Sequence, residues 1–312
     1  MLPMEIIDLH KIEGEESVSS PLSVALGNFD GVHVGHAALI SRAVEYARAR
    51  GIKSAVWTFS DDTASLPSKS GARCITSTDE KLALFRELGA DYAFLVPFDE
   101  VRDYSPEKFV REILVEKCGA VCAVCGFNFR FGKGGAGDSA QLSRLMSPRD
   151  CIVVPAVYVD SALTSSTAVR ALVEGGDVES AAKLLGREFS IEVPVIEGKH
   201  LGRTIGIPTI NQNFRDGYVI PKNGVYACTL RINGKDYRGV ANVGVRPTIK
   251  EDGHKINCET HIIGYTGELY GEIVRTSFAK RLRDEMKFSS VEELRAQIRR
   301  DIEATKKYFL DR

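Results

Sequence analysis

The sequence lacks an excess of charge of either sign and lacks a long apolar run. It has 41 basic and 42 acidic residues in 312, a net charge of −1, which gives no electrostatic basis for binding nucleic acid or an anionic membrane. No apolar run approaches the ~20 residues of a membrane span, and Met1 to His10 is too short and acidic to be expected as a signal peptide. We therefore expect neither nucleic acid nor membrane as a partner, and the sequence predicts no oligomeric state.

The chain also lacks a regular set of cysteines. Seven scattered cysteines, an odd number, argue against a disulfide framework and predict a reducing, cytoplasmic location. Cys122 and Cys125 have the spacing of a metal-binding pair, but they lie in the apolar run 120–125, which is typical of a buried strand. Positions three apart on a strand point to opposite faces, so we interpret both as core cysteines.

Two domains are expected from the length, and the first half alternates strand and helix patterns. Ser77 and Glu80 form a predicted capping box, and Ser105-Pro106 predicts a helix start. Such βα repeats predict a doubly wound α/β domain with a parallel sheet. The predicted strands are 5–9, 24–29, 54–59, 92–96, 120–125 and 152–157, and the predicted helices are 36–50, 77–88, from 105 onward, and about 138–146.

One Gly-rich stretch joins the second predicted strand to the first helix. Gly31 and Gly35 allow the backbone to approach a ligand closely, and a helix N-terminus suits phosphate. His33 and His36 are three apart across the helix start, so both imidazoles are expected on one side, where they can stabilise charge in phosphoryl or nucleotidyl transfer. The alternatives are a metal pair, which needs a third ligand, or two surface histidines. The full stretch reads Gly27-Asn28-Phe29-Asp30-Gly31-Val32-His33-Val34-Gly35-His36.

A second Gly-rich loop runs from Gly126 to Asp138. It is not a Walker A loop, because five residues separate Gly126 from Gly132 and Gly134 stands where Ser or Thr is required. Its three phenylalanines, including Phe129, alternate with Asn128 and Arg130, a pattern that suits a flat aromatic ligand carrying phosphate. The alternative is a strand end followed by a flexible turn.

The third stretch is Ser165-Ser166-Thr167-Ala168-Val169-Arg170. Ser or Thr can cap a helix whose first turn holds phosphate, and Arg170 lies one turn further along. A bidentate arginine on a polyphosphate is one interpretation. A plain helix cap with a solvated arginine is the other.

The pattern changes after a short helix at 178–185. Strands are predicted at 189–196, 224–232, 235–243, 258–263 and 272–278, followed by a helix from about 290 to 309 with apolar Val291, Leu294, Ile298 and Ile302. A run of strands after a run of βα units predicts a second domain, a small β-barrel closed by a C-terminal helix.

Polar motifs punctuate this second half. In an extended segment, Thr209 and Asn211 face the same way, so their oxygens can jointly hold Mg²⁺ and phosphates. They end the Gly-rich stretch Gly202-Arg203-Thr204-Ile205-Gly206-Ile207-Pro208-Thr209-Ile210-Asn211. Four further motifs follow it, Asn223–Tyr226, Asn242–Thr248, Glu259–His261 and Arg281–Glu285. Taken singly, these motifs also fit β-turns, an edge-strand carboxylate and a charged helix face.

The combined motifs resemble those of the bacterial bifunctional riboflavin kinase/FMN adenylyltransferase (FAD synthetase) family, within the H-x-G-H nucleotidyltransferase superfamily. The resemblance covers about residues 20 to 309 and includes the signature at Gly27–His36, the loop after Gly126 and the Ser-Ser-Thr-x-x-Arg element. The family's Pro-Thr-Ala-Asn kinase motif has Ile210 in place of Ala here.

The resemblance implies an FMN adenylyltransferase domain at 1–185 and a riboflavin kinase domain at 186–312, with substrates ATP, riboflavin and FMN, product FAD and cofactor Mg²⁺. It implies catalytic roles for His33, His36, Arg170 and Glu259, Glu259 being the general base of the kinase. It implies ATP or phosphate binding by Gly27, Asn28, Phe29, Gly31, Gly35, Ser165, Ser166, Thr167, Gly202, Arg203 and Gly206. It implies flavin binding by Asn128, Phe129, Arg246, Arg281 and Arg283, and Mg²⁺ binding by Thr209 and Asn211.

Two departures from the family pattern affect the first half. Ser60-Asp61-Asp62 stands where the family usually has a segment with proline and histidine near the flavin, and Thr164 replaces a common isoleucine. Three alternatives remain. One is a riboflavin kinase whose first domain only senses flavin or nucleotide, another is a nucleotidyltransferase for a substrate such as phosphopantetheine, and the third is a ligand-binding barrel without chemistry.

Overall fold

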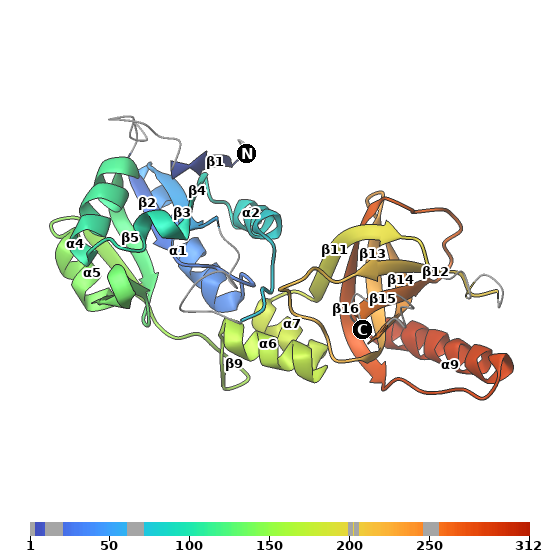
Figure 1. Cartoon of the computed structure of the whole chain (residues 1–312). Helices are drawn as coiled ribbons and strands as arrows, with labels where there is room; N and C mark the ends of the chain where they lie inside the picture. Colours follow the sequence, from blue (N-terminus) through green and yellow to red (C-terminus); the bar gives the residue numbers. More distant parts are fainter. Residues whose placement is uncertain (1–3, 10–20, 61–71, 199–201, 203–205, 246–255) are drawn as a thin grey trace. The chain divides into compact units, whose positions relative to one another are not determined.

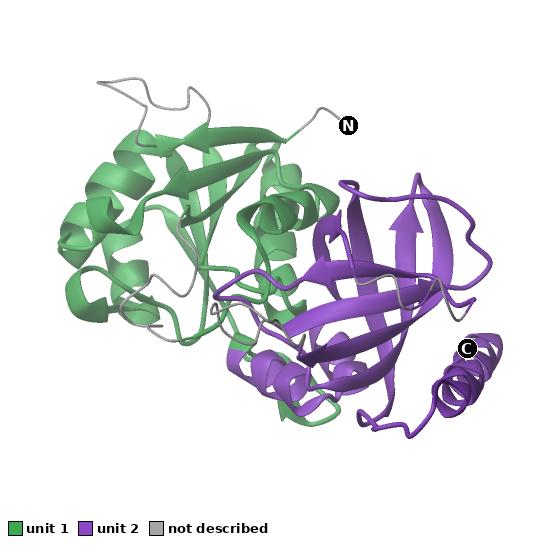
Figure 2. Ribbon diagram, turned by 45° about the vertical axis from the view of Figure 1, so that its right-hand side comes forward, with its two compact units in different colours: residues 1–166 green, residues 167–312 purple. Residues whose placement is uncertain are grey.

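The computed structural model describes residues 4–9, 21–60, 72–198, 202, 206–245 and 256–312. The chain folds into two compact units, residues 1–166 and 167–312 (Figure 2). The predicted division at 185/186 differs from this one, because two helices, α6 (Ser166–Gly175) and α7 (Val178–Leu185), fall almost entirely in the second unit.

The first unit is built on a six-stranded sheet in the order β1-β4-β3-β2-β5-β8, in which every pair of neighbours is parallel (Figure 1). The predicted doubly wound parallel sheet is therefore confirmed. From the central β2 the chain builds outward through β3 and β4, then crosses to β5 on the other side of β2. Ligands of such sheets bind at this reversal point, outside the carboxyl ends of the strands. The strands are β1 (Glu5–Asp8), β2 (Leu22–Leu26), β3 (Lys53–Phe59), β4 (Tyr92–Val96), β5 (Ala120–Gly126) and β8 (Asp150–Val154).

Helices cover both faces of this sheet (Figure 1). The predicted capping box of Ser77 and Glu80 is present at α2, and Gly51 ends α1 with φ +65°. The helix that begins after Ser105 continues as a π-helix, which the sequence pattern did not predict. One face packs against α1 (Val34–Arg50) and α2 (Thr78–Glu87), and the other against α4 (Pro106–Lys108), the π-helix η4 (Phe109–Lys117) and α5 (Ser139–Met146).

Cys122 and Cys125 lie on opposite faces of β5, as predicted. Cys122 belongs to the apolar core that contains Ile40 of α1, whereas Cys125 belongs to the core that contains Leu114 of η4. Burial raises the pKa of Cys122 to about 11, so its thiol stays protonated at neutral pH. Among the described residues, no three metal-ligating side chains gather at one point.

Several short elements complete the first unit. A helical turn, α3 (Phe98–Val101), precedes α4, and two small hairpins lie outside the main sheet. The first hairpin pairs β6 (Arg130–Phe131) with β7 (Gly137–Asp138) around the 3-10 turn Lys133–Gly135, and the second pairs β9 (Tyr158–Val159) with β10 (Ala162–Leu163). The sequence pattern predicted neither hairpin, because strands of two residues are too short to show an alternation.

The second unit is a closed barrel with strand order β11-β12-β15-β14-β13-β16, followed by the C-terminal helix α9 (Figure 1). The predicted small barrel and terminal helix are confirmed. Strand β16 runs to Arg283, so Arg281 and Arg283 belong to a strand and not to a charged helix face. The bounds are β11 (Phe189–Ile196), β12 (Thr209–Asn213), β13 (Gly224–Ile232), β14 (Lys235–Val245), β15 (Ile256–Ile262), β16 (Ile273–Arg283) and α9 (Val291–Leu310).

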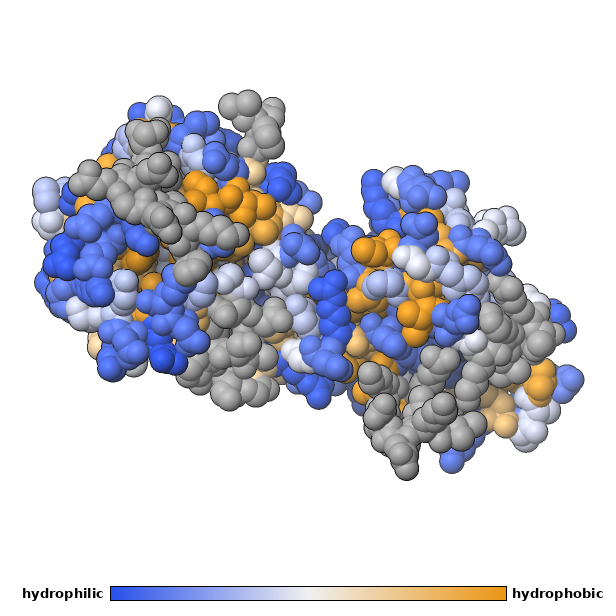
Figure 3. Space-filling model, turned by 45° about the horizontal axis from the view of Figure 1, so that its top comes forward, coloured by the Kyte–Doolittle hydropathy of each residue, from blue (hydrophilic) through white to orange (hydrophobic). Residues whose placement is uncertain are grey.

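Alternation along the barrel strands separates an interior face from an exterior face. Tyr226, Leu230, Cys258 and Phe278 are fully buried and fill the interior. Helix α9 packs on the exterior, against β13 and β14. The molecular face in Figure 3 is mostly hydrophilic with small apolar groups, and no helix among the described residues is long and apolar enough to cross a membrane.

Candidate functional sites

His33 and His36 lie together at the N-terminus of α1. His33 is the helix cap, and its Nδ1 accepts a hydrogen bond from the His36 N–H at 3.2 Å. The two rings are stacked, with centroids 3.6 Å apart and planes 15° apart. This is the shared side that their spacing predicted. Because Nδ1 of His33 is an acceptor, its Nε2 is left as the atom that can carry a proton outward.

The backbone of the signature turn is held by a buried carboxylate. Asp30 is 2% exposed, and its Oδ1 accepts from the backbone N–H groups of Ile75 at 2.9 Å and Thr76 at 3.2 Å. The Thr76 hydroxyl in turn accepts from the N–H of Gly31 at 2.9 Å. Gly31 has φ +83°, a conformation in which a side chain is strained. These contacts fix the turn without using the His33 and His36 rings.

Three residues of this turn that were predicted to bind nucleotide have structural contacts. Phe29 is fully buried, and its ring meets the edge of His36 at 5.2 Å and of Phe85 at 5.5 Å between centroids. The buried Phe29 ring therefore packs against the His36 ring and restricts its position. A side chain at Gly35 would come within 3.1 Å of the His33 ring, and one at Gly27 would come equally close to the Phe29 ring. These glycines make room for the rings.

The neighbouring Asn28 is half-buried, and its carbonyl oxygen accepts from the Thr58 hydroxyl at 3.1 Å. This hydrogen bond ties the start of the turn to β3. Asn28 follows the end of β2 by two residues, at the sheet edge where parallel α/β folds bind ligands.

Helix α1 is anchored at its other end by Tyr46. The Tyr46 hydroxyl donates a short hydrogen bond to Asp150 of β8, and Arg50 lies over the Tyr46 ring at 3.7 Å. Burial, together with the hydrogen bond to Asp150, raises the pKa of Tyr46 to about 12. The hydroxyl therefore stays protonated at neutral pH and keeps donating, which fixes the helix that carries both histidines.

The loop after β5 lies at the same sheet edge as the signature, since β5 neighbours β2. Phe129 is half-buried, its N–H donates to the Gly126 carbonyl at 3.0 Å, and its ring stacks near Phe131 at 5.7 Å. Asn128 is exposed at the tip of this turn. The loop therefore presents an amide beside a small aromatic stack, which is compatible with the predicted flavin contact.

The Ser-Ser-Thr-x-x-Arg element lies at the boundary of the two units. The Ser166 hydroxyl donates to the carbonyl of Asp30 at 2.8 Å, which brings the start of α6 to the signature turn. Ser165 is half-buried and immediately precedes α6. Thr167 and Arg170 lie further along α6, within the second unit. Their positions relative to the histidines stay a prediction.

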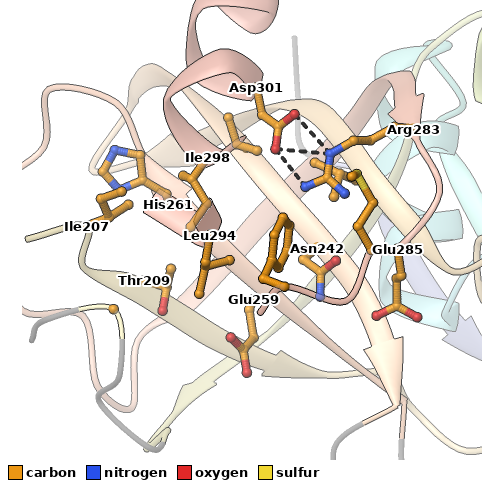
Figure 4. Close-up of a pocket in the computed structure, with 15 residues that line it drawn as sticks. Ile207, Thr209, Asn242, Glu259, His261, Arg283, Glu285, Leu294, Ile298 and Asp301 are labelled. Atoms are coloured by element: carbon orange, nitrogen blue, oxygen red, sulfur yellow. Dashed lines mark hydrogen bonds and ion pairs between the residues drawn. The ribbon is translucent and has the colours of Figure 1, made fainter. Parts of the chain in front are cut away.

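The second unit contains a pocket of about 280 Å³ between the barrel exterior and α9 (Figure 4). Leu294 and Ile298 of α9 form an apolar wall, and Thr209, Asn242 and Glu259 lie on the strand side. The remaining lining residues are Gly202, Ile207, Val225, Val240, His261, Arg283, Glu285, Met286, Phe288 and Asp301.

Glu259 lies at the centre of a polar row on three adjacent strands. It is exposed, and its cross-strand neighbours are Asn211 on β12 and Asn242 on β14. Asn257, two positions earlier on β15, donates to Asn211 Oδ1 at 3.3 Å and approaches Glu259 Oε1 at 3.5 Å. Thr209 lies on the same face as Asn211, as predicted. Thr209 lines the pocket, whereas Asn211 is 6% exposed and does not line it.

Two of the three arginines predicted to bind flavin have partners within the protein. Arg283 lines the pocket but donates to Asp301 of α9 at 2.8 to 3.2 Å. Arg281 donates to the carbonyl of Asn223 at 2.7 Å and to Asp284 at 2.6 Å. Burial opposes the charge of Arg281, and its hydrogen bonds to Asp284 and Tyr226 outweigh that effect and raise its pKa.

The Gly-rich stretch before β12 is described only in part. Gly202 accepts a backbone hydrogen bond from Ile207 at 2.8 Å, and a side chain there would approach the Thr209 hydroxyl at 3.3 Å. Gly206 has φ +75°. The predicted ATP contact Arg203 and flavin contact Arg246 lie outside the described residues, as do Asp61 and Asp62.

Comparison with known proteins decides the family. A family model described as FAD synthetase matches residues 15–168, and one described as riboflavin kinase matches residues 185–309. A bifunctional riboflavin kinase/FMN adenylyltransferase of Bacillus subtilis is 33% identical over 314 aligned positions, covering 99% of this chain and 98% of that protein. The chain belongs to the bifunctional riboflavin kinase/FMN adenylyltransferase family.

Further relatives agree over most of the chain. The Escherichia coli member of the family (strain K12) is 36% identical over 292 positions, or 92% of each chain. A crystal structure described as a macrolide-efflux protein from Streptococcus pneumoniae is 29% identical, with a TM-score of 0.85 over 98% of this chain and 99% of that one. Family membership thus extends across both units.

Two residues of the second site were missed by the sequence analysis. The sequence analysis predicted Ile302 on the apolar face of this helix, because it follows Leu294 and Ile298 at helical spacing. Asp301 lies three residues after Ile298, which also places it on that face, and it is the buried residue. Asn257 was missed because it lies two positions before the motif at Glu259. The available signal was its place on the same strand face.

Proposed function

We propose that this chain phosphorylates riboflavin to FMN in residues 186–312 and adenylylates FMN to FAD in residues 1–185. The observation that supports the pair of activities most directly is that one chain carries both a stacked His33/His36 pair at a helix N-terminus and a Glu259-centred pocket. The matches of the two family models to separate segments support the division.

In the adenylyltransferase reaction, a phosphate oxygen of FMN attacks the α-phosphorus of ATP, and the bond to the leaving pyrophosphate breaks. The FMN phosphate is already a nucleophile, so the site needs charge stabilisation more than a strong base. We assign that role to His33 and His36, whose donors sit where α1 adds its partial positive charge. Arg170 would neutralise the leaving group, and Ser165, Ser166 and Thr167 would bind phosphate at the start of α6.

In the kinase reaction, the 5′-hydroxyl of the ribityl chain attacks the γ-phosphorus of ATP, and ADP leaves. We assign Glu259 as the base that takes the hydroxyl proton, since it is exposed at the pocket and lies on a strand rather than a flexible loop. Phosphoryl transfer depends mainly on placement and charge neutralisation. We assign the apolar wall of Leu294 and Ile298 to the flavin ring.

Mg²⁺ fits the donors of this site. Thr209 and Asn211 offer a hydroxyl and an amide oxygen on one strand face, and Mg²⁺ prefers such hard oxygen ligands together with water and substrate phosphates. When bound there, the ion would neutralise charge on the transferring phosphates. Because Thr209 lines the pocket and the buried Asn211 does not, Thr209 is the more accessible of the two ligands.

A cytoplasmic location fits these reactions, and the buried thiol of Cys122, with its raised pKa, is compatible with a reducing compartment. The alternative of a kinase with a flavin-sensing first domain is less well supported. The His33/His36 arrangement and the match to FAD synthetase over residues 15–168 both favour chemistry in the first half.

The deciding experiment is a time course with riboflavin, ATP and Mg²⁺, with flavins separated by chromatography. The proposal predicts FMN first and FAD after it, with neither formed when the metal is chelated. FMN without FAD would support the kinase-only alternative. Absence of FMN would refute the kinase assignment.

A further inference from the structure

His261, on the same strand as the proposed base Glu259, contacts the residue that precedes Thr209. The Nδ1 atom of His261 lies 2.9 Å from the carbonyl oxygen of Pro208. His261 is two residues after Glu259 on β15 and lines the same pocket (Figure 4). Glu259 and His261 therefore share one face of β15, and the His261 ring reaches the residue that precedes β12.

The chemistry of this contact fixes the role of each ring nitrogen. A carbonyl oxygen only accepts, so Nδ1 of His261 must carry the hydrogen and donate it. Nε2 lies on the other side of the ring from this bond. The hydrogen bond persists in both the neutral Nδ1-protonated form and the charged form of the ring.

The Pro208 carbonyl lies just before the first residue of β12, where the pairing of β12 with β15 ends. β12 begins at Thr209, whose register partner on β15 is His261 itself, so this pair is the last rung of the ladder. The preceding Pro208 has no N–H with which to extend the ladder. The hydrogen bond from the His261 side chain to the Pro208 carbonyl thus holds the chain one residue beyond the last paired residues of β12 and β15.

The other side of Thr209 is closely packed. A side chain at Gly202 would run into the Ile207 carbonyl oxygen and approach the Thr209 hydroxyl at 3.3 Å. The Ile207 N–H also donates back to the Gly202 carbonyl at 2.8 Å. The Thr209 hydroxyl therefore lies close to Gly202, and the residue that precedes Thr209 is held through its carbonyl by His261.

We infer that His261 is a positioning residue of the kinase reaction, which sets the Thr209 hydroxyl at a fixed distance from Glu259 through its Nδ1 hydrogen bond to Pro208. This inference rests on the proposed kinase function. It assigns His261 no contact with the substrate and no proton transfer. Because transfer depends on placement, releasing the Pro208 carbonyl should slow the reaction even though Thr209 and Glu259 are intact.

Asparagine and glutamine substitutions at His261 test the roles of the two ring nitrogens separately. The amide nitrogen of an asparagine side chain at this position can occupy the place of Nδ1, whereas that of a glutamine reaches the place of Nε2. We therefore expect His261→Asn to keep kcat/KM for MgATP in FMN formation within about threefold of wild type. His261→Gln and His261→Ala should each lose roughly tenfold or more, in line with one lost hydrogen bond and a displaced group.

The full chain supplies two controls. FAD formation from added FMN should be unchanged in all three variants, because a general folding defect would lower it as well. Asp236→Asn, which removes an exposed ion pair with Arg231 at the hairpin of β13 and β14, should leave FMN formation unchanged. The apparent KM for riboflavin of the His261 variants should also stay within about twofold of wild type, since the proposal places the effect of His261 on Thr209, which is assigned to the phosphates and not to the flavin.

The outcomes are distinct. If wild type forms no FMN, the proposed function fails before the variants are compared. If wild type is active and His261→Gln performs as well as His261→Asn, or His261→Ala matches wild type, the positioning role is wrong. An equal loss in the Asn and Gln variants would also overturn it, because the Nδ1 donation would then not be what matters.

Discussion

Asp301 of α9 and Arg283 of β16 form a buried, bidentate ion pair across the wall of the pocket between the barrel and α9. Arg283 Nε donates to Oδ1 at 3.0 Å and Nη2 donates to Oδ2 at 2.8 Å, while the Gln297 amide donates to Oδ1 at 2.9 Å. Asp301 is only 4% exposed. The pair fastens α9 to the barrel at the point where Leu294 and Ile298 face the pocket.

Replacing Asp301 with asparagine should destabilise the second unit. The change keeps the size of the side chain but leaves the Arg283 charge uncompensated in a largely buried place, which should cost about 2–3 kcal/mol. Urea unfolding of the full chain measures the loss. Glu192→Gln is the matched control, because it removes an ion pair with Arg275 that is exposed on the same barrel. In the control pair both Arg275 donors reach one oxygen, Oε2 of Glu192. Because the pair is exposed, its loss should cost less than about 1 kcal/mol, and equal losses would contradict a buried role for the first pair.

His36→Ala should separate the two activities. Removing one donor beside a developing phosphate charge typically slows the reaction about a hundred- to thousand-fold. We therefore expect FAD formation to fall by that amount while FMN formation continues at the wild-type rate. Chromatography of a riboflavin and ATP reaction would show FMN accumulating without FAD. Parallel loss of both products would indicate a folding defect, and undiminished FAD would refute the role of His36.

Glu259→Gln should give the opposite pattern. Glutamine keeps the shape of the side chain and can still meet Asn257, but it cannot take the proton of the ribityl hydroxyl. FMN formation should fall about a hundred-fold or more, and FAD formation from supplied FMN should persist. The variant would disprove the assignment of Glu259 as base if it converted riboflavin at the wild-type rate.

Gly31→Ala should impair FAD formation beyond its effect on stability. Gly31 has φ +83°, and an added methyl group would meet Ile75 at 3.0 Å, next to the backbone that Asp30 holds. Gly51→Ala is the matched control, since Gly51 has φ +65° at the end of α1 with open space around it. Both changes should cost about 1–2 kcal/mol of stability through backbone strain. Only Gly31→Ala should lower FAD formation severalfold in a stability-matched assay.

Much of the architecture was accessible from the sequence because it depends on local periodicity and capping. The strand Phe189–Ile196 and the helix Val178–Leu185 have the bounds that their patterns predicted, and Ser77 with Glu80 forms the predicted capping box. The stacking of His33 and His36 also follows from local geometry, since three residues across a helix start bring two side chains to one side.

Tertiary structure decided the features that depend on which distant residues meet. Nothing local predicts that Arg283 faces Asp301 rather than a ligand, that Asp30 holds the backbone at Ile75, or that His261 reaches Pro208. These contacts depend on barrel register and on where a helix docks, and the sequence by itself encodes neither in a readable local pattern. The sequence determined the elements and the chemistry available to them, and the packing of those elements determined which polar groups remain for substrates.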